Sequence, residues 1–133
     1  MIVRGVVLVS LLLAGCASVP GPDCGPGQEA MTHDVLYLGT QTPGGVVSSA
    51  EWADFLATAV TPRFPDGLTT WDASGQWKSK ESAIVREPSH VLDIVHADTA
   101  ASEAAIDTIT REYKARFRQE SVMRVTRKSC VSF

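Results

Sequence analysis

The stretch LTTWDASGQWKSKESAIVREPSHVLDIVHA, residues 68–97, decides the fold of this chain. Its two halves, residues 68–79 and 83–97, are rich in β-branched and aromatic residues, and a short polar segment at residues 80–82 separates them. Such a pattern is typical of two long antiparallel strands joined by a tight turn. We therefore expect a long β-hairpin in the middle of the chain.

Gly75 and Pro88 interrupt the two strands at nearly equal distances from Glu81. In a hairpin that turns around Glu81 they would lie nearly opposite each other. Glycine and proline inside strands usually mark bulges or bends. We expect a bulge or bend at this point rather than two separate short hairpins.

A helix precedes the hairpin. Ser48 and Glu51 have the Ser-x-x-Glu spacing of a capping box, and Pro62 makes continuation past Thr61 unfavourable. An apolar stripe with helical spacing runs between these ends. The stripe consists of Trp52, Phe55, Leu56, Ala59 and Val60.

A second helix follows the hairpin and begins near Thr99. Ser102, Ile106, Ile109, Tyr113 and Phe117 share one of its faces. Residues 33–40 and 121–133 have strand character, and residues 41–45 form a flexible turn or loop.

The resulting order is β-α-β-β-α-β, the split-βαβ or ferredoxin-like pattern. We predict an α+β sandwich: an antiparallel four-stranded sheet in the order 4-1-3-2, with two helices on one face. The chain has 133 residues, enough for one domain, and we assign residues 32–133 to it.

The first residues resemble a bacterial lipoprotein signal. A basic residue at Arg4 is followed by an apolar run that is too short to span a bilayer. Leu13-Ala14-Gly15-Cys16 then resembles a lipobox. We predict a signal peptide over residues 1–15, the alternative being an ordinary signal peptide with an incidental cysteine.

The lipoprotein resemblance implies that Cys16 becomes the mature N-terminus, carries acyl chains and anchors the protein in a membrane. Because Ala17 rather than Asp follows Cys16, it also favours the outer over the inner membrane. Residues 16–31, rich in Pro and Gly, are expected to form a flexible tether that holds the domain on the periplasmic side.

Cys24 and Cys130 remain as an even pair in an oxidising compartment, which favours a disulfide over two free thiols. In the predicted topology the first and last strands are antiparallel neighbours. Cys24 would lie before the start of one and Cys130 near the end of the other, so the fold and the cysteine count agree.

The formal net charge of the chain is −3, and basic residues concentrate after Arg111. An acidic exported chain is a poor nucleic-acid binder. The basic C-terminal third has two interpretations: a surface for anionic lipid or an acidic partner, or a solvated face that complements the helix dipole. We favour the second.

The segment TPRFPDGLT at residues 61–69, followed by GQW and REPS, resembles a family of small bacterial envelope proteins classed as a domain of unknown function. The similarity extends over about residues 35–95. It implies a fold and an envelope location, and no mechanism, because the family has no established activity.

Several residues in and after this segment are candidates for binding. Arg63, held between Pro62 and Pro65, presents a guanidinium that binds carboxylate or phosphate. The alternative, which we favour, is an internal salt bridge to Asp66 or Glu87. The candidate set is Arg63, Asp66, Trp77, Arg86 and Glu87. Neighbours in a strand point to opposite faces, so Arg86 and Glu87 share a pocket only if Pro88 creates a bulge.

His33 and His96 would lie at one end of the sheet, near Asp34, Asp66 and Asp93. A metal or acid-base site is conceivable there, but no ligand spacing supports it. We therefore predict no metal site and no cofactor.

The chain has no phosphate-binding glycine loop and no Gly-x-Ser-x-Gly motif. We favour a binding or structural module of the cell envelope, with an envelope protein partner or self-association through the open face of the sheet. The alternative is a small periplasmic enzyme in which Arg63 positions an anionic substrate and Glu87, His33 or His96 is the acid or base.

Overall fold

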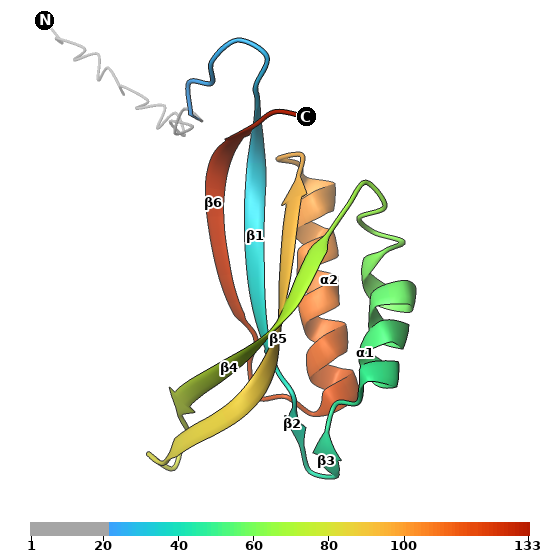
Figure 1. Ribbon diagram of the computed structural model, residues 1–133, viewed down its shortest axis with the longest axis vertical. Coiled ribbons are helices and arrows are strands. Elements are labelled where there is room, and N and C mark those ends of the chain that lie inside the picture. The colour runs from blue at the N-terminus through green and yellow to red at the C-terminus, as the bar shows by residue number, and fades with distance from the viewer. Residues whose placement is uncertain (1–21) are drawn as a thin grey trace, which may run out of the picture.

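The computed structural model describes residues 22–133, and Figure 1 shows their arrangement. The chain folds into an α+β sandwich with the predicted β-α-β-β-α-β order. The long elements are β1 (Glu29–Gly39), α1 (Ser49–Phe55) with its π-helical continuation η1 (Leu56–Val60), β4 (Thr69–Lys78), β5 (Ile84–His96), α2 (Ala100–Phe117) and β6 (Met123–Val131). A small hairpin of β2 (Gln41–Thr42) and β3 (Gly45–Val46) lies within the predicted loop.

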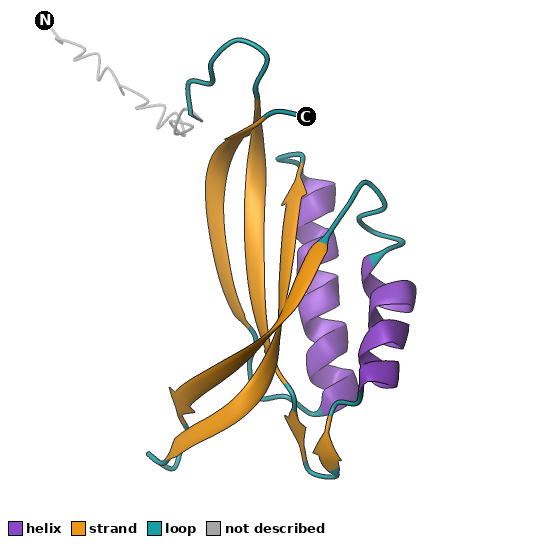
Figure 2. Cartoon of the chain, viewed as in Figure 1, coloured by secondary structure: helices purple, strands orange, loops and turns teal. Residues whose placement is uncertain are grey.

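The four long strands form an antiparallel sheet in the order β4-β5-β1-β6. This is the predicted ferredoxin-like order, since β1, β4, β5 and β6 are the first to fourth strands of the pattern. Both helices cover the same face, and the other face of the sheet is open (Figure 2). The prediction of the fold is confirmed.

Local sequence explains where the helices begin. The Ser48 hydroxyl accepts a hydrogen bond from the backbone N–H of Glu51, and the Glu51 carboxylate accepts one from the backbone N–H of Ser48. This is the predicted capping box. The hydroxyl of Thr99 caps α2 in the same way by accepting from Ser102.

The core lies between the helices and the sheet. Leu36 and Leu38 of β1 and Leu92 of β5 are fully buried against Phe55 and Tyr113 of the helices. The predicted stripes are buried as expected, except that Leu56 and Ser102 are half-buried. Buried and more exposed side chains alternate along β1, because successive side chains point to opposite faces of the sheet and only one face contacts this core.

The central hairpin is irregular at Gly75 and Pro88, as expected. Ser74 pairs with Pro88 and Gly75 with Glu87, so these residues do face each other. The register continues through them without a bulge, so the structure has the second of the two expected alternatives, a bend. The bend is present: beyond this point β4 and β5 curve together away from the rest of the sheet (Figure 1).

The boundary between tether and domain also differs from the prediction. β1 begins at Glu29, inside the segment 16–31 assigned to the tether, because residues 29–31 pair with β6. Tertiary hydrogen bonds there outweigh the Gly-rich composition that precedes them. The predicted signal peptide at residues 1–15 and Cys16 lie outside the described residues.

Cys24 and Cys130 form a disulfide with a Cα–Cα distance of 5.5 Å. It joins the segment before β1 to the end of β6. A crosslink that closes so long a loop stabilises a fold by about 4 kcal/mol in the chain-entropy account. None of the helices in the described part of the chain is long and apolar enough to cross a membrane.

The basic residues of the C-terminal third are largely engaged within the molecule. Arg116 contacts Asp54, and Arg124 contacts Glu103. Lys114 and Arg116 also lie in the last turn of α2, where positive charge complements the helix dipole. These contacts support the interpretation of a structural rather than a partner-binding basic face.

Candidate functional site

Two cavities lie at opposite ends of the sheet, and each contains residues that the sequence singles out. One lies where β4 and β5 bend away, beside the end of β1 and the start of β6. The other lies where β4 begins and β5 ends. We name them the Glu87 cavity and the Arg63 cavity after the charged residue that characterises each.

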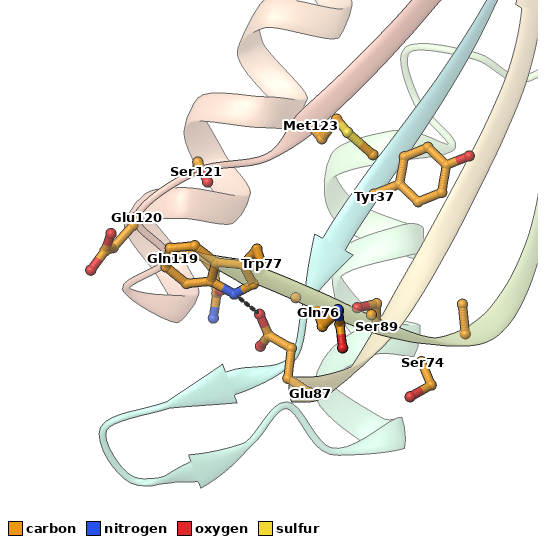
Figure 3. A pocket seen from close by; sticks show the side chains of 13 residues that line it. Tyr37, Ser74, Gln76, Trp77, Glu87, Ser89, Gln119, Glu120, Ser121 and Met123 are labelled. Atoms are coloured by element: carbon orange, nitrogen blue, oxygen red, sulfur yellow. Dashed lines mark hydrogen bonds between the residues drawn. The ribbon is translucent and has the colours of Figure 1, made fainter. Parts of the chain in front are cut away.

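The Glu87 cavity has a volume of about 390 Å³. Its lining comes from β1, β4, β5 and β6 and from the connection after α2 (Figure 3). The lining residues are Tyr37, Gly39, Ala73, Ser74, Gly75, Gln76, Trp77, Glu87, Ser89, Gln119, Glu120, Ser121 and Met123.

Glu87 lines this cavity, and the residue is 8% exposed. One of its oxygens accepts a hydrogen bond from the indole N–H of Trp77 at 2.9 Å, and the other accepts one from the backbone N–H of Gln41 at 3.0 Å. Figure 3 shows the Trp77 contact. Each carboxylate oxygen therefore has one fixed N–H donor.

Gly39 leaves the space in which this carboxylate lies. A Cβ atom at position 39 would be 2.6 Å from Oε1 of Glu87, which is closer than nonbonded atoms approach each other. The Glu87 side chain would have to move to admit it. The absence of a side chain at Gly39 thus determines where the carboxylate is held.

No ion pair in residues 22–133 involves Glu87. The cavity lining contains no lysine, arginine or histidine. Burial raises the pKa of Tyr113, and the negative charge of the Glu87 carboxylate raises it further. Buried carboxylates in proteins are usually paired with a cation, and Glu87 is unusual in this respect among the described residues.

Apolar side chains form the wall of the cavity on the open face of the sheet. Tyr37 and Met123 are directly opposite each other on β1 and β6, and they are 38% and 57% exposed. Trp77 is 36% exposed. The cavity therefore combines one buried carboxylate with accessible aromatic and thioether surfaces.

The Arg63 cavity has a volume of about 440 Å³. Its lining includes part of the TPRFPDGLT segment. The lining residues are Met31, Arg63, Phe64, Asp66, Gly67, Leu68, Thr69, Asp93, Val95, His96, Ala97, Ser102 and Phe133.

The Arg63 guanidinium is engaged within the protein. It donates to the backbone carbonyl of Ala59 at the end of the first helix and to the carboxylate of Glu112 on α2, the latter at 2.7 Å. The internal salt bridge expected from the sequence is thus present, but the expected partners, Asp66 and Glu87, are wrong. The α2 residue could not be identified as a neighbour before the helices were packed together.

The two histidines expected at one end of the sheet lie there, on opposite faces. His33 is on the open face, where Nε2 lies 2.8 Å from Asp93 and Nδ1 accepts from Arg127. His96 is on the helix-covered face and contacts Asp34 at 2.9 Å. Within residues 22–133, no group of three or more metal-ligating side chains is placed to hold a metal ion.

Asp34 is fully buried beside the Arg63 cavity. Its oxygens accept two hydrogen bonds from the guanidinium of Arg124, at 2.8 and 2.7 Å, and others from Thr126 and His96. Burial alone would raise the pKa of Asp34, but the hydrogen bonds from Arg124, Thr126 and His96 outweigh it and lower the pKa to about 2. This carboxylate has a protein counterion, whereas none of the residues described in the structure forms an ion pair with Glu87.

The structure divides the candidate residues of the sequence into three groups. Trp77 and Glu87 come together at one cavity, whereas Arg63 and Asp66 line the other. Arg86 lines neither cavity and donates to Gln76 on β4. Because the strand register is continuous, Arg86 points away from Glu87, as expected for adjacent strand residues without a bulge.

Sequence reasoning missed several residues of the Glu87 cavity, including Tyr37, Gly39, Met123 and the segment 119–121. Alternation along β1 was a usable signal for Tyr37, since its neighbours Leu36 and Leu38 face the core. The sequence does not place residues 119–121 beside Trp77, because β4 and β6 lie at opposite edges of the sheet and the shared cavity depends on the bend of β4 and β5.

Residues 33–133 match the model of DUF3574, a family of proteins of unknown function. The chain belongs to this family. The match covers most of the chain, and the predicted membership of an uncharacterised family is confirmed. The lipoprotein character and the envelope location are separate matters and stay predictions. No curated protein gives a significant match to the chain.

Solved structures of a phage SAM lyase resemble this fold. The lyase in complex with S-methyl-5′-thioadenosine has a TM-score of 0.60 and 14% sequence identity, and the similarity covers 84% of this chain and 95% of that chain. For the apo state the values are 0.57 and 13%, with 87% and 97% covered. At this level of identity the similarity establishes the shared fold.

Proposed function

We propose that this DUF3574 protein is a lipid-anchored binding module of the cell envelope and that the Glu87 cavity is its ligand site. The observation that carries the proposal is the buried Glu87 carboxylate, which has fixed N–H donors and forms no ion pair within residues 22–133. A concave site with apolar walls and a few positioned polar groups is the usual form of a small-ligand pocket.

The sequence supports the envelope part of the proposal. Cys16 follows a lipobox-like Leu-Ala-Gly, and the residues between it and β1 are long enough to hold the domain away from a membrane. Acylation is tested by labelling cells with a clickable palmitate analogue. We expect labelling of the wild-type protein and none of the Cys16→Ser variant, and fractionation of the membranes then tests the preference for the outer membrane.

The ligand site is tested with the indole N–H resonance of Trp77, since this group donates to Glu87. The full chain, in a non-ionic detergent, would be titrated with a polar small-molecule extract of the cells that produce it. We expect the Trp77 resonance to move and that of Trp52, which is buried in the core, to stay. Movement only of resonances from residues around Arg63 would place the site at the other cavity and contradict the proposal.

An enzyme is the second candidate, and the similarity to phage SAM lyase is the observation that favours it. The test is incubation with SAM, followed by chromatography for S-methyl-5′-thioadenosine, with wild type and Glu87→Gln side by side. The other enzyme hypothesis, an anionic substrate at Arg63, has less support, because that guanidinium already binds Glu112 and a helix carbonyl.

A further inference from the structure

We infer that the Glu87 cavity takes an organic cation, with the positive charge against the Glu87 carboxylate and a methylated or flat body against Trp77, Tyr37 and Met123. The inference rests on the proposed function, because it names the chemical class of ligand for that same site. It is argued from the charge state of Glu87, the composition of the lining and the shape of the walls.

The hydrogen bonds of Glu87 are those of an ionised carboxylate. Its two oxygens each accept from an N–H group, one from Trp77 and one from Gln41. A neutral carboxylic acid would carry a hydrogen on one oxygen, and that oxygen is a poor acceptor. Both donors are neutral, so they orient the negative charge without cancelling it.

Burial makes an uncancelled charge costly. Removing a carboxylate from water without a counterion is unfavourable, and neutral N–H donors offset only part of the lost hydration. A bound cation would recover much of this cost, because the attraction between opposite charges strengthens where water is excluded. Burial of the ionised Glu87 carboxylate is thus less costly in the complex with a cation than in the free protein.

The other charged group of the lining does not change this conclusion. Glu120 is also acidic, so the lining has negative charge at two points and no basic residue. Glu120 is exposed and has Lys80 at 4.0 Å, a contact that solvent screens. Glu87 therefore determines the preference of the cavity for a positive charge, and an anionic ligand would be repelled.

The walls favour an organic cation over a bare metal ion. Trp77 and Tyr37 present aromatic surface, and aromatic faces attract ammonium and similar cations. Met123, opposite Tyr37, adds a polarisable thioether surface that adapts to methyl groups. A metal ion would need several oxygen or nitrogen ligands at once, and none of the described residues form such a group.

A matched pair of probes separates charge from shape. Choline and its neutral isostere 3,3-dimethyl-1-butanol have nearly the same shape, and only the first carries a charge. Each would be titrated into the full chain, with the Trp77 indole resonance as the readout. We expect choline to bind at least about tenfold more tightly than the alcohol, since about 1.4 kcal/mol of charge-dependent attraction gives that ratio.

Three variants complete the experiment. Glu87→Gln keeps the shape and removes the charge, and Gly39→Ala displaces the carboxylate without changing the charge of the chain. Both should abolish the preference for choline over the alcohol. Glu81→Gln, in the exposed turn after β4, should retain it.

The outcomes distinguish the inference from the proposed function. Equal binding of both probes, or an unchanged preference in Glu87→Gln, would overturn the cationic class while leaving the cavity as a ligand site. No Trp77 response to choline would also overturn it. The proposed function falls only if the cell extract likewise leaves the Trp77 resonance unmoved.

Discussion

The two cavities of this molecule differ in how the buried carboxylate near each of them is neutralised. At the Arg63 cavity, Arg63 pairs with Glu112, and the buried Asp34 pairs with Arg124. At the Glu87 cavity, the donors to the buried carboxylate within residues 22–133 are two neutral N–H groups. At one end of the sheet the buried carboxylate, Asp34, has an arginine counterion, whereas at the other end the described chain supplies none for the buried Glu87 carboxylate.

The difference indicates which end is structural and which is available for a ligand. Charged residues that form ion pairs within the protein contribute to its stability, and a charged ligand gains little further electrostatic attraction from them. A buried charge without a counterion costs stability and raises affinity for a ligand of opposite charge. Substitutions at the Arg63 end should therefore change folding, and substitutions at the Glu87 end should change binding.

The largest expected effect is at Asp34. Asp34→Ala removes the two hydrogen bonds that the guanidinium of Arg124 donates to Asp34 and leaves Nε2 of His96 without its partner. We expect the free energy of unfolding in urea to fall by about 3 kcal/mol or more. Asp72→Ala is the control: Asp72 is exposed and forms an ion pair with His90, so its loss should cost less than about 1 kcal/mol. Equal losses in the two variants would mean that the Asp34 network stabilises the fold no more than an exposed ion pair does.

The pH dependence of stability should follow the same network. The pKa of Asp34 is lowered from 3.8 to about 2 in the folded protein, so the folded state binds this proton less readily than the unfolded state. The stabilisation is therefore fully present above about pH 4 and is lost as the pH falls through about 2; it amounts to about 2 kcal/mol. Urea unfolding at a series of pH values checks this. Asp34→Asn should reduce the acid-dependent loss, and an unchanged loss would assign it to other carboxylates.

Arg63→Ala should lower the free energy of unfolding less than Asp34→Ala does, and it should leave the Glu87 cavity unchanged. It removes the contact with Glu112 and a hydrogen bond to a helix carbonyl, in a side chain that is partly exposed. We expect a loss of about 1 kcal/mol in unfolding free energy, with the Trp77 indole resonance and choline binding unchanged. Arg111→Ala, which removes only an exposed contact with Thr108, should be nearly neutral. Loss of ligand binding in Arg63→Ala would contradict the division between the two ends.

The smallest effect on stability is expected for Glu87→Gln, although Glu87 is buried. The amide loses one of two hydrogen bonds, but the cost of burying an unpaired charge disappears as well. We expect the free energy of unfolding to change by less than about 1 kcal/mol in either direction, while the preference for a cation is lost. A loss above about 2 kcal/mol would show that Glu87 is chiefly a structural residue.

The sequence by itself determined the order of elements, and it did so through local signals. The capping box at Ser48 and Glu51 is confirmed because its hydrogen bonds join residues only three positions apart. The strand and helix patterns are confirmed because the core selects one face of each element. Topology rules then place the first and last strands together, and with them Cys24 and Cys130.

Tertiary structure alone decided the partners of the charged residues. Arg63 contacts Glu112 rather than the nearer Asp66, because the packing of α2 against the first helix brings that carboxylate to it. Glu87 lies beside Trp77, Gly39 and the segment after α2 because four strands meet there. Hydrogen bonds between distant residues depend on the packing of whole elements to within an ångström. The sequence pattern specifies those elements but not their mutual distances.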